Sequence, residues 1–282
     1  MNVLEQLYTD VAQFREYSPY TESNISFSDL SSSALSAVKQ VVSMLSKPIY
    51  DSLLKNDDEK KDALRCAVAN LTLAKQLVFN VLSLRKADVD VYKSEQEQMK
   101  RAYRDNYFNS MDTLLQLLDS DEEWKKTDTY QRMNQLQLKT VAEFDRVYPI
   151  DNSYLYFFRC IPIQQEALDD YAGSYYDRLK KDDATTRRKL DRTLAKLVVA
   201  ISLRRFDILE FPATIRNLFE ETTAGRSGKD EQQRMITLAD ELFAQALESL
   251  SSIDLILSGE QTTDIVTQTS FNEPTDKIYL MG

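Results

Sequence analysis

Few residue types that carry out catalysis occur in this chain in usable patterns. Its 282 residues include no histidine and two cysteines, Cys66 and Cys160. Without histidine, the Ser-His-Asp and Cys-His nucleophile systems and histidine-ligated zinc or iron sites are excluded. Two cysteines are too few for a disulfide framework, and without a histidine to act as base we expect neither cysteine to be catalytic. We therefore expect a protein that is not an enzyme and that holds no cofactor or metal.

Three local patterns look like binding motifs but are better explained as structure. The segment Gly225-Arg226-Ser227-Gly228-Lys229 contains the Gly-Lys pair of a P-loop. It lacks the Ser or Thr that must follow the lysine, because Asp230 occupies that position. The acidic run Asp119–Glu123 lacks the spacing and central glycine of an EF-hand, and it predicts a polar linker. The aromatic run Tyr154–Phe158 predicts core packing, with a base-stacking platform or an interface anchor as alternatives.

A basic cluster is the strongest candidate for a binding surface. It lies between positions 180 and 205 and contains only three acids, whereas the whole chain carries a net charge of −10. One interpretation is the polar face of an amphipathic helix, paired with neighbouring carboxylates; the other is a patch for nucleic acid or for an acidic protein partner. For the second, we expect contact between subunits through these residues: Arg187, Arg188, Arg192 and Lys196.

Composition and charge narrow the class of protein further. The chain has 43% hydrophobic residues, enough for a core, and five glycines, where average usage of about 7% would give roughly twenty. That scarcity disfavours glycine-rich phosphate cradles and β-hairpins. The acidic balance repels DNA phosphates and anionic lipid. With no basic leader and no apolar run of about 18 residues, we expect no signal peptide and no contact with a membrane.

Short matches recur in the same order in the two halves of the sequence. The pattern Val11-Ala12-Gln13-Phe14 reappears as Val141-Ala142-Glu143-Phe144, and the segment 50–57 aligns with 176–183. Further apolar positions follow at similar offsets. We interpret the chain as a tandem duplication of a unit of about 125 residues.

Each copy predicts four helices, which makes the fold all-α. We expect them at about 2–17, 29–45, after the acidic pair Asp57-Asp58 and from Ser94, and in the second copy at about 129–147, 155–170, after Asp182-Asp183 and from Asp230. The long ones show apolar residues at i, i+3, i+4 and i+7. The predicted organisation is helical repeat 1 over 1–122, helical repeat 2 over 123–257 and an extended tail over 258–282.

The tail departs from this helical pattern. It is rich in threonine and ends in a segment of high β propensity. A β-prone segment on a helical body either frays or adds a strand to a partner's sheet. We expect the partner to contact Ile265, Val266, Phe271, Ile278, Tyr279 and Leu280.

Several segments resemble an uncharacterised family encoded in tailed phages and prophages of Bacteroidetes. They include 63–71, 107–115, Glu123-Trp124 and Phe157-Phe158-Arg159, and the likeness spans about two-thirds of the chain. A small helical unit with an extended tail also resembles the head–tail connector (adaptor) proteins of tailed phages. Members of that class form a ring of about twelve copies beneath the portal. This chain departs from them by its double length, and neither likeness implies catalytic residues.

The resemblance implies a structural virion protein of the neck, assembled in the bacterial host cytoplasm. Its partners would be the portal protein, tail or neck proteins and further copies of itself in a ring of about twelve. DNA would pass through an acidic lumen as cargo only. The alternative is a cytoplasmic helical-repeat scaffold or regulator that binds a protein between the two copies.

Overall fold

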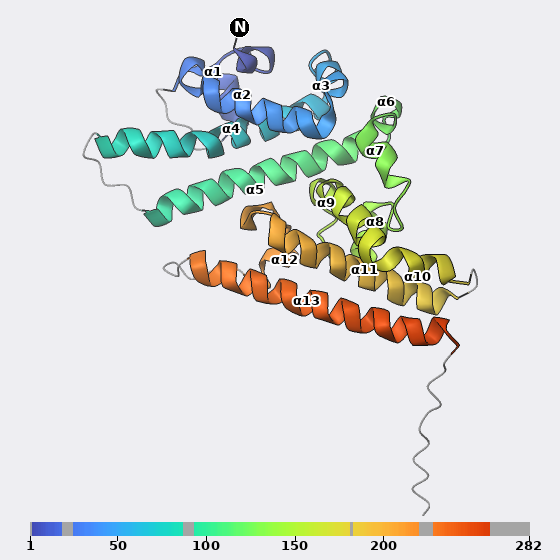
Figure 1. Ribbon diagram of the computed structural model, residues 1–282. Helices are drawn as coiled ribbons and strands as arrows, with labels where there is room; N and C mark the ends of the chain where they lie inside the picture. Colours follow the sequence, from blue (N-terminus) through green and yellow to red (C-terminus); the bar gives the residue numbers. More distant parts are fainter. Residues whose placement is uncertain (1, 19–24, 87–92, 181–182, 220–227, 260–282) are drawn as a thin grey trace, which may run out of the picture.

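The computed structural model describes residues 2–18, 25–86, 93–180, 183–219 and 228–259. Every regular element in these ranges is helical, so the all-α prediction is confirmed for the described residues. Figure 1 shows the arrangement: the long helix α5 (Lys93–Leu118) crosses the middle, with the N-terminal helices above it and the C-terminal helices below. None of the described helices is long and apolar enough to span a membrane.

The described part of the N-terminal half contains three long helices, α2 (Phe27–Leu45), α4 (Glu59–Lys86) and α5, and three short elements. Helix α4 packs against α5 and against α2. The short elements are η1 (Val3–Gln6), α1 (Val11–Glu16) and α3 (Lys47–Leu53). These short elements, α2 and α4 form the upper layer in Figure 1, above α5.

The C-terminal half is built around two antiparallel helices, α11 (Ala184–Arg205) and α13 (Gly228–Leu257). Helix α9 (Tyr154–Ala167) packs against α11 and continues through a π-helical turn, η2 (Leu168–Ala172), into α10 (Gly173–Arg178). The remaining elements are α6 (Glu122–Lys125), α7 (Asp128–Met133), α8 (Val141–Val147), η3 (Ile208–Glu210) and α12 (Ala213–Arg216).

The first predicted helix of each half is wrong, because each is two short helices. The chain is extended at Asp10 and at Thr140, where φ is −157° and −124°. Each of these side chains accepts a hydrogen bond from the backbone N–H three residues later, at Gln13 and at Glu143. An N-cap of this kind starts a new helix and so interrupts the preceding one.

The two halves share an order of elements and a packing scheme. In the first, α4 packs against α2 and α5; in the second, α11 packs against α9 and α13. Ser26 and Ser153 cap the corresponding helices α2 and α9. This order is what a duplication predicts, while common ancestry of the halves stays a prediction. The predicted boundary between residues 122 and 123 falls within α6.

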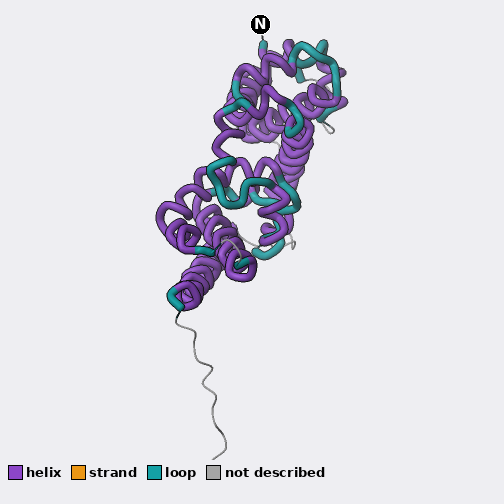
Figure 2. The backbone as a smooth tube through the Cα atoms, turned by 90° about the vertical axis from the view of Figure 1, so that its right-hand side faces the viewer, coloured by secondary structure: helices purple, strands orange, loops and turns teal. Residues whose placement is uncertain are grey.

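One apolar cluster runs from Leu4 in the first half to Ile253 in the second. Trp124 of α6 is fully buried and stacks edge-on against Phe158 of α9, with ring centroids 5.4 Å apart. Leu155, Tyr156 and Phe157 are buried as well, which confirms that the aromatic run serves core packing. Figure 2 shows the result as an elongated stack of helices, with one half above the other.

Candidate protein-binding surface

The four basic residues predicted to form a patch lie on α11. The helix begins after Asp183, whose side chain accepts a hydrogen bond from the N–H of Thr186 at 2.9 Å. Leu190, Leu194 and Leu197 turn inward and are fully buried. Arg188, Arg192 and Lys196 follow one another at i, i+4 spacing, so they share the outer face of the helix.

Several members of the basic cluster pair with side chains of the same chain. Arg187 contacts Asp191 at 3.0 Å and donates a hydrogen bond to Gln137 at 3.0 Å. Lys196 donates to Gln245 of α13 at 2.9 Å. Two more ion pairs lie towards the end of α11: Arg204 with Asp240 and Arg205 with Glu166. For these residues the interpretation as a paired polar helix face holds.

Three residues of α11 have no such partner. Within the ranges that the structure describes, the side chains of Arg188, Lys189 and Arg192 are exposed and make no hydrogen bond or ion pair. Arg146 of α8 lies beside them and is likewise exposed and unpaired among those residues. Lys196, one turn after Arg192, continues this row of cations although it donates a hydrogen bond to Gln245. We call Arg188, Lys189, Arg192 and Lys196 the α11 basic ridge. It is a concentrated positive surface on a strongly acidic chain.

Two hollows flank the α11 basic ridge. One, of about 270 Å³, lies between α8 and α11 and is bordered by Arg146, Arg188 and Arg192. The other, of about 370 Å³, lies between α11 and α13 and is called here the α11–α13 groove. Its lining includes Lys189, Arg192 and Lys196 of α11, and Glu248, Ser252 and Ile253 of α13. Three cations against one carboxylate make the groove suited to an acidic segment.

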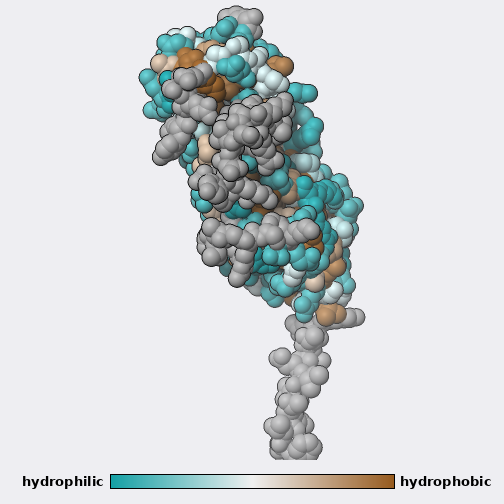
Figure 3. All heavy atoms as spheres, turned by 90° about the vertical axis from the view of Figure 1, so that its left-hand side faces the viewer, coloured by the Kyte–Doolittle hydropathy of each residue, from teal (hydrophilic) through white to brown (hydrophobic). Residues whose placement is uncertain are grey.

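Apolar surface is more dispersed than this charge. Single large exposed apolar side chains occur on α2, α4 and α5 and just after α12, and four more are distributed along α13. They are Leu35, Phe79, Met99 and Leu218, and on α13 Ile236, Leu247, Leu255 and Ile256. Figure 3 shows one side of the molecule, where the described surface is mainly hydrophilic with small hydrophobic areas. The α11 basic ridge is therefore the better-defined candidate for binding.

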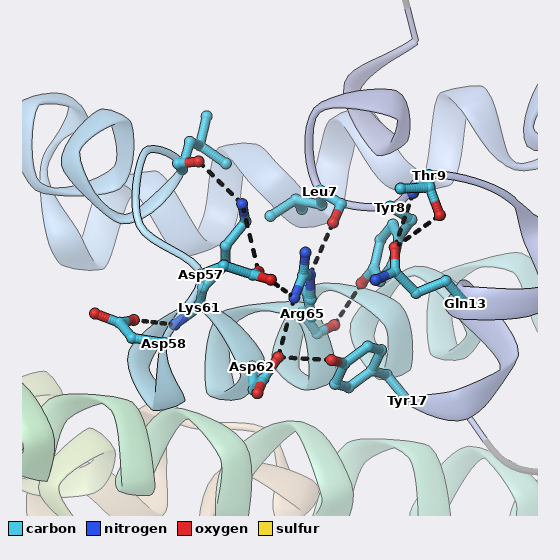
Figure 4. Close-up of polar contacts among 11 residues, drawn as sticks. Leu7, Tyr8, Thr9, Gln13, Tyr17, Asp57, Asp58, Lys61, Asp62 and Arg65 are labelled. Atoms are coloured by element: carbon cyan, nitrogen blue, oxygen red, sulfur yellow. Dashed lines mark hydrogen bonds and ion pairs between the residues drawn. The ribbon is translucent and has the colours of Figure 1, made fainter.

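A buried arginine centre in the N-terminal half was missed by sequence reasoning (Figure 4). The Arg65 guanidinium donates to the Leu7 carbonyl at 2.8 Å and contacts the carboxylates of Asp57 at 2.8 Å and Asp62 at 3.0 Å. Tyr17 donates its hydroxyl to Asp62 at 2.6 Å. Burial is the main cause that raises the pKa of Tyr17. This centre ties the first residues to α4, and only its i, i+3 Asp62–Arg65 spacing was visible in the sequence.

A second set of ion pairs joins α5 to the C-terminal half. Glu210 of η3 lies between Arg104 of α5, at 3.4 Å, and Arg159 of α9, at 3.0 Å. All three side chains are largely buried. Two further pairs extend the contact along the same face of α5: Asp105 with Arg216 at 2.9 Å and Arg101 with Glu231 at 3.2 Å. These contacts hold the two halves in one arrangement.

The cysteines and the acidic run at 119–123 show no reactive or metal-binding arrangement in the described part of the chain. Cys160 is buried, and burial raises the pKa of its thiol to about 12, so the thiol stays protonated at neutral pH. In the described part of the chain, no three metal-ligating side chains come together. Asp121 of the acidic run caps α6 and pairs with Lys60 at 3.0 Å.

The remaining predicted positions belong to the tail and to the glycine-containing loop before α13. The tail residues Ile265, Val266, Phe271, Ile278, Tyr279 and Leu280 lie outside the described residues, as does most of the loop at 225–229.

Comparison with protein-family models, with curated proteins and with solved structures finds no match.

Proposed function

We propose that this chain is a structural protein that binds other proteins, and specifically that it is a head–tail connector of a tailed-phage virion. The observation that carries the proposal is the junction at Glu210, where one carboxylate joins α5 of the first half to α9 of the second. Largely buried ion pairs of this kind fix geometry, because removing either partner leaves a charge without compensation. A part that joins two larger assemblies needs such a fixed body.

The α11 basic ridge supports the proposal from the surface side. Subunits in a ring meet through two different faces, so each must carry complementary patches. An exposed positive ridge on a chain of net charge −10 supplies one face that attracts acidic protein surface. The rest of the acidic surface would let DNA pass without binding. The portal, tail or neck proteins and neighbouring copies are the proposed partners, and no catalytic step is part of this function.

Co-sedimentation with the portal protein encoded in the same genome tests this function. The full chain is mixed with assembled portal rings and compared with the chain alone, at low and high salt. The proposal predicts that the chain pellets with the portal and saturates at a fixed ratio. A chain that stays in the supernatant at every ratio would contradict the connector and would favour the scaffold of the bacterial cytoplasm.

A further inference from the structure

The α11–α13 groove lies close to where the chain leaves its last helix. Helix α13 ends at Leu257, and Ser252 and Ile253 in the groove are about one to two turns earlier, on the order of 10 Å along the helix. Gly259 has φ of +71°, the left-handed conformation that ends a helix and turns the chain away from its axis. The described part of the chain therefore ends close to the groove.

The start of the tail is held in place by Arg178 of α10. Its guanidinium contacts the Asp254 carboxylate at 2.5 Å and donates to the hydroxyl of Ser258 at 3.1 Å. The backbone N–H of Ser258 also donates to the Asp254 carbonyl at 2.9 Å. Both ends of the connection, the groove and the exit of the tail, thus belong to one packed unit of α10, α11 and α13.

The tail has the composition that the groove requires. Residues 260–282 carry four carboxylates and one lysine, Lys277. The carboxylates belong to these residues: Glu260, Asp264, Glu273 and Asp276. An extended segment of this length reaches about 75 Å, several times the distance to the far end of the α11 basic ridge. Ile265 and Val266 come directly after Asp264 and would suit the apolar floor at Ile253.

From these observations we propose that residues 260–282 bind in the α11–α13 groove of their own chain, with tail carboxylates against Lys189, Arg192 and Lys196. The short connection favours the same chain over a second copy, since a tethered segment is present at an effective concentration of order millimolar. Glu248 is the one carboxylate among the described lining residues, so three cations against one carboxylate keep the groove positive towards the tail.

Binding of the tail in the groove would regulate assembly of the connector. This regulatory effect rests on the proposed function, whereas the binding itself does not. The tail and the α11 basic ridge are the two surfaces through which a connector would meet its partners. In the free chain each would cover the other, so copies would not associate through the ridge. A portal or a neighbouring copy would have to displace the tail before assembly.

Zero-length cross-linking of the full chain tests the binding directly. A carbodiimide joins a carboxylate to a lysine amine only when the two are in contact, and mass spectrometry identifies the joined peptides. The expected links connect tail carboxylates to Lys189 or Lys196, several-fold more often than to Lys39, an exposed lysine of α2. They should weaken when the ionic strength rises from about 0.1 M to about 1 M, which shortens the Debye length from about 10 Å to about 3 Å.

Two controls separate the alternatives. Arg192→Glu keeps both lysines but reverses the central charge of the groove, and it should reduce these links several-fold, whereas Lys100→Glu on α5 should leave them unchanged. A mixture of ¹⁴N and ¹⁵N chains should give links within one isotope only. Tail links spread evenly over all exposed lysines would overturn the proposal, and so would links that mostly join two isotopes. The cross-linking uses this chain alone, without the portal. A failure of the tail to bind the groove is therefore distinguishable from a failure of the chain to bind the portal.

Discussion

The carboxylate of Asp112 in α5 accepts a hydrogen bond from the backbone N–H of Leu155, in the first turn of α9, at 2.7 Å. The same oxygen accepts the hydroxyl of Ser153 at 3.1 Å. A residue of the N-terminal half thus satisfies an end amide of a helix in the C-terminal half. The contact extends the ionic junction along α5 beyond Arg104 and Asp105, and it places a titratable group between the two halves.

Replacing Asp112 with Asn should remove a pH dependence of stability. Burial raises the pKa of Asp112 from 3.8 to about 6, and the hydrogen bonds from Leu155 and Ser153 oppose that rise. The folded state then binds a proton more tightly than the unfolded state. The resulting stabilisation is complete below about pH 4 and is lost as pH rises through 6, an effect of up to about 3 kcal/mol.

Urea unfolding of both proteins at several pH values measures this effect. Asn keeps an oxygen that can accept the Leu155 N–H but does not titrate. The free energy of unfolding of the original chain, relative to Asp112→Asn, should therefore fall between pH 4 and pH 7. A difference between the two proteins that stays constant over this range would contradict the assignment.

Glu210→Gln should destabilise the junction more than a comparable change at the surface. It removes the charge that compensates Arg104 and Arg159, and we expect a loss of about 2–4 kcal/mol, because all three side chains are largely buried. Glu166→Gln is the matched control. Its pair with Arg205 is half exposed and should cost at most about 1 kcal/mol. Equal losses in the free energy of unfolding of the two variants, measured by chemical denaturation, would contradict the prediction that the junction at Glu210 stabilises the fold more than a surface ion pair does.

Gly173→Ala tests the π-helical turn between α9 and α10. A Cβ at Gly173 would lie 2.7 Å from the carbonyl oxygen of Leu168, and this neighbour is backbone that cannot rotate away. Relief requires a shift of the turn, so we expect a loss of about 1–3 kcal/mol in the free energy of unfolding. The exposed neighbour Ser174→Ala should change it by no more than about 0.5 kcal/mol. If both variants match the original chain, the turn is not constrained at this position.

Deleting residues 262–282 should separate folding from docking. The described core ends at Ile253, before the deletion, so the helical circular-dichroism signal and the cooperative thermal transition should persist. Docking to the portal should be lost, because the proposed contact residues of the tail, from Ile265 to Leu280, are removed. Docking that survives the deletion would move the portal contact onto the helical body.

The sequence predicted the long helices well because their apolar residues repeat with helical periodicity. Helices α4, α5, α11 and α13 lie close to their expected positions. The short helices α3 and α10 were not predicted, and their few residues carry too little periodicity to be recognised. N-caps at Asp10 and Thr140 were also overlooked, which merged two pairs of short helices into single ones.

The ionic contacts could not be predicted because their partners are distant in sequence. Arg104 and Glu210 are typical residues of a polar helix face and a loop, and only the packing of α5 on the C-terminal half brings them together. The basic patch was predicted as a set of residues, but the sequence did not separate its members. Arg187 and Lys196 have partners in the fold, while Arg188 and Arg192 have none in the described part of the chain.

The mass of the complex between this chain and its portal tests the connector proposal most directly. Mass photometry of portal rings with the chain in excess should show one heavier species, displaced from the bare portal by the mass of a closed ring of about twelve copies of this chain. The 32.6 kDa of each copy makes that displacement large. A portal peak that keeps its mass at every chain concentration would contradict the proposal.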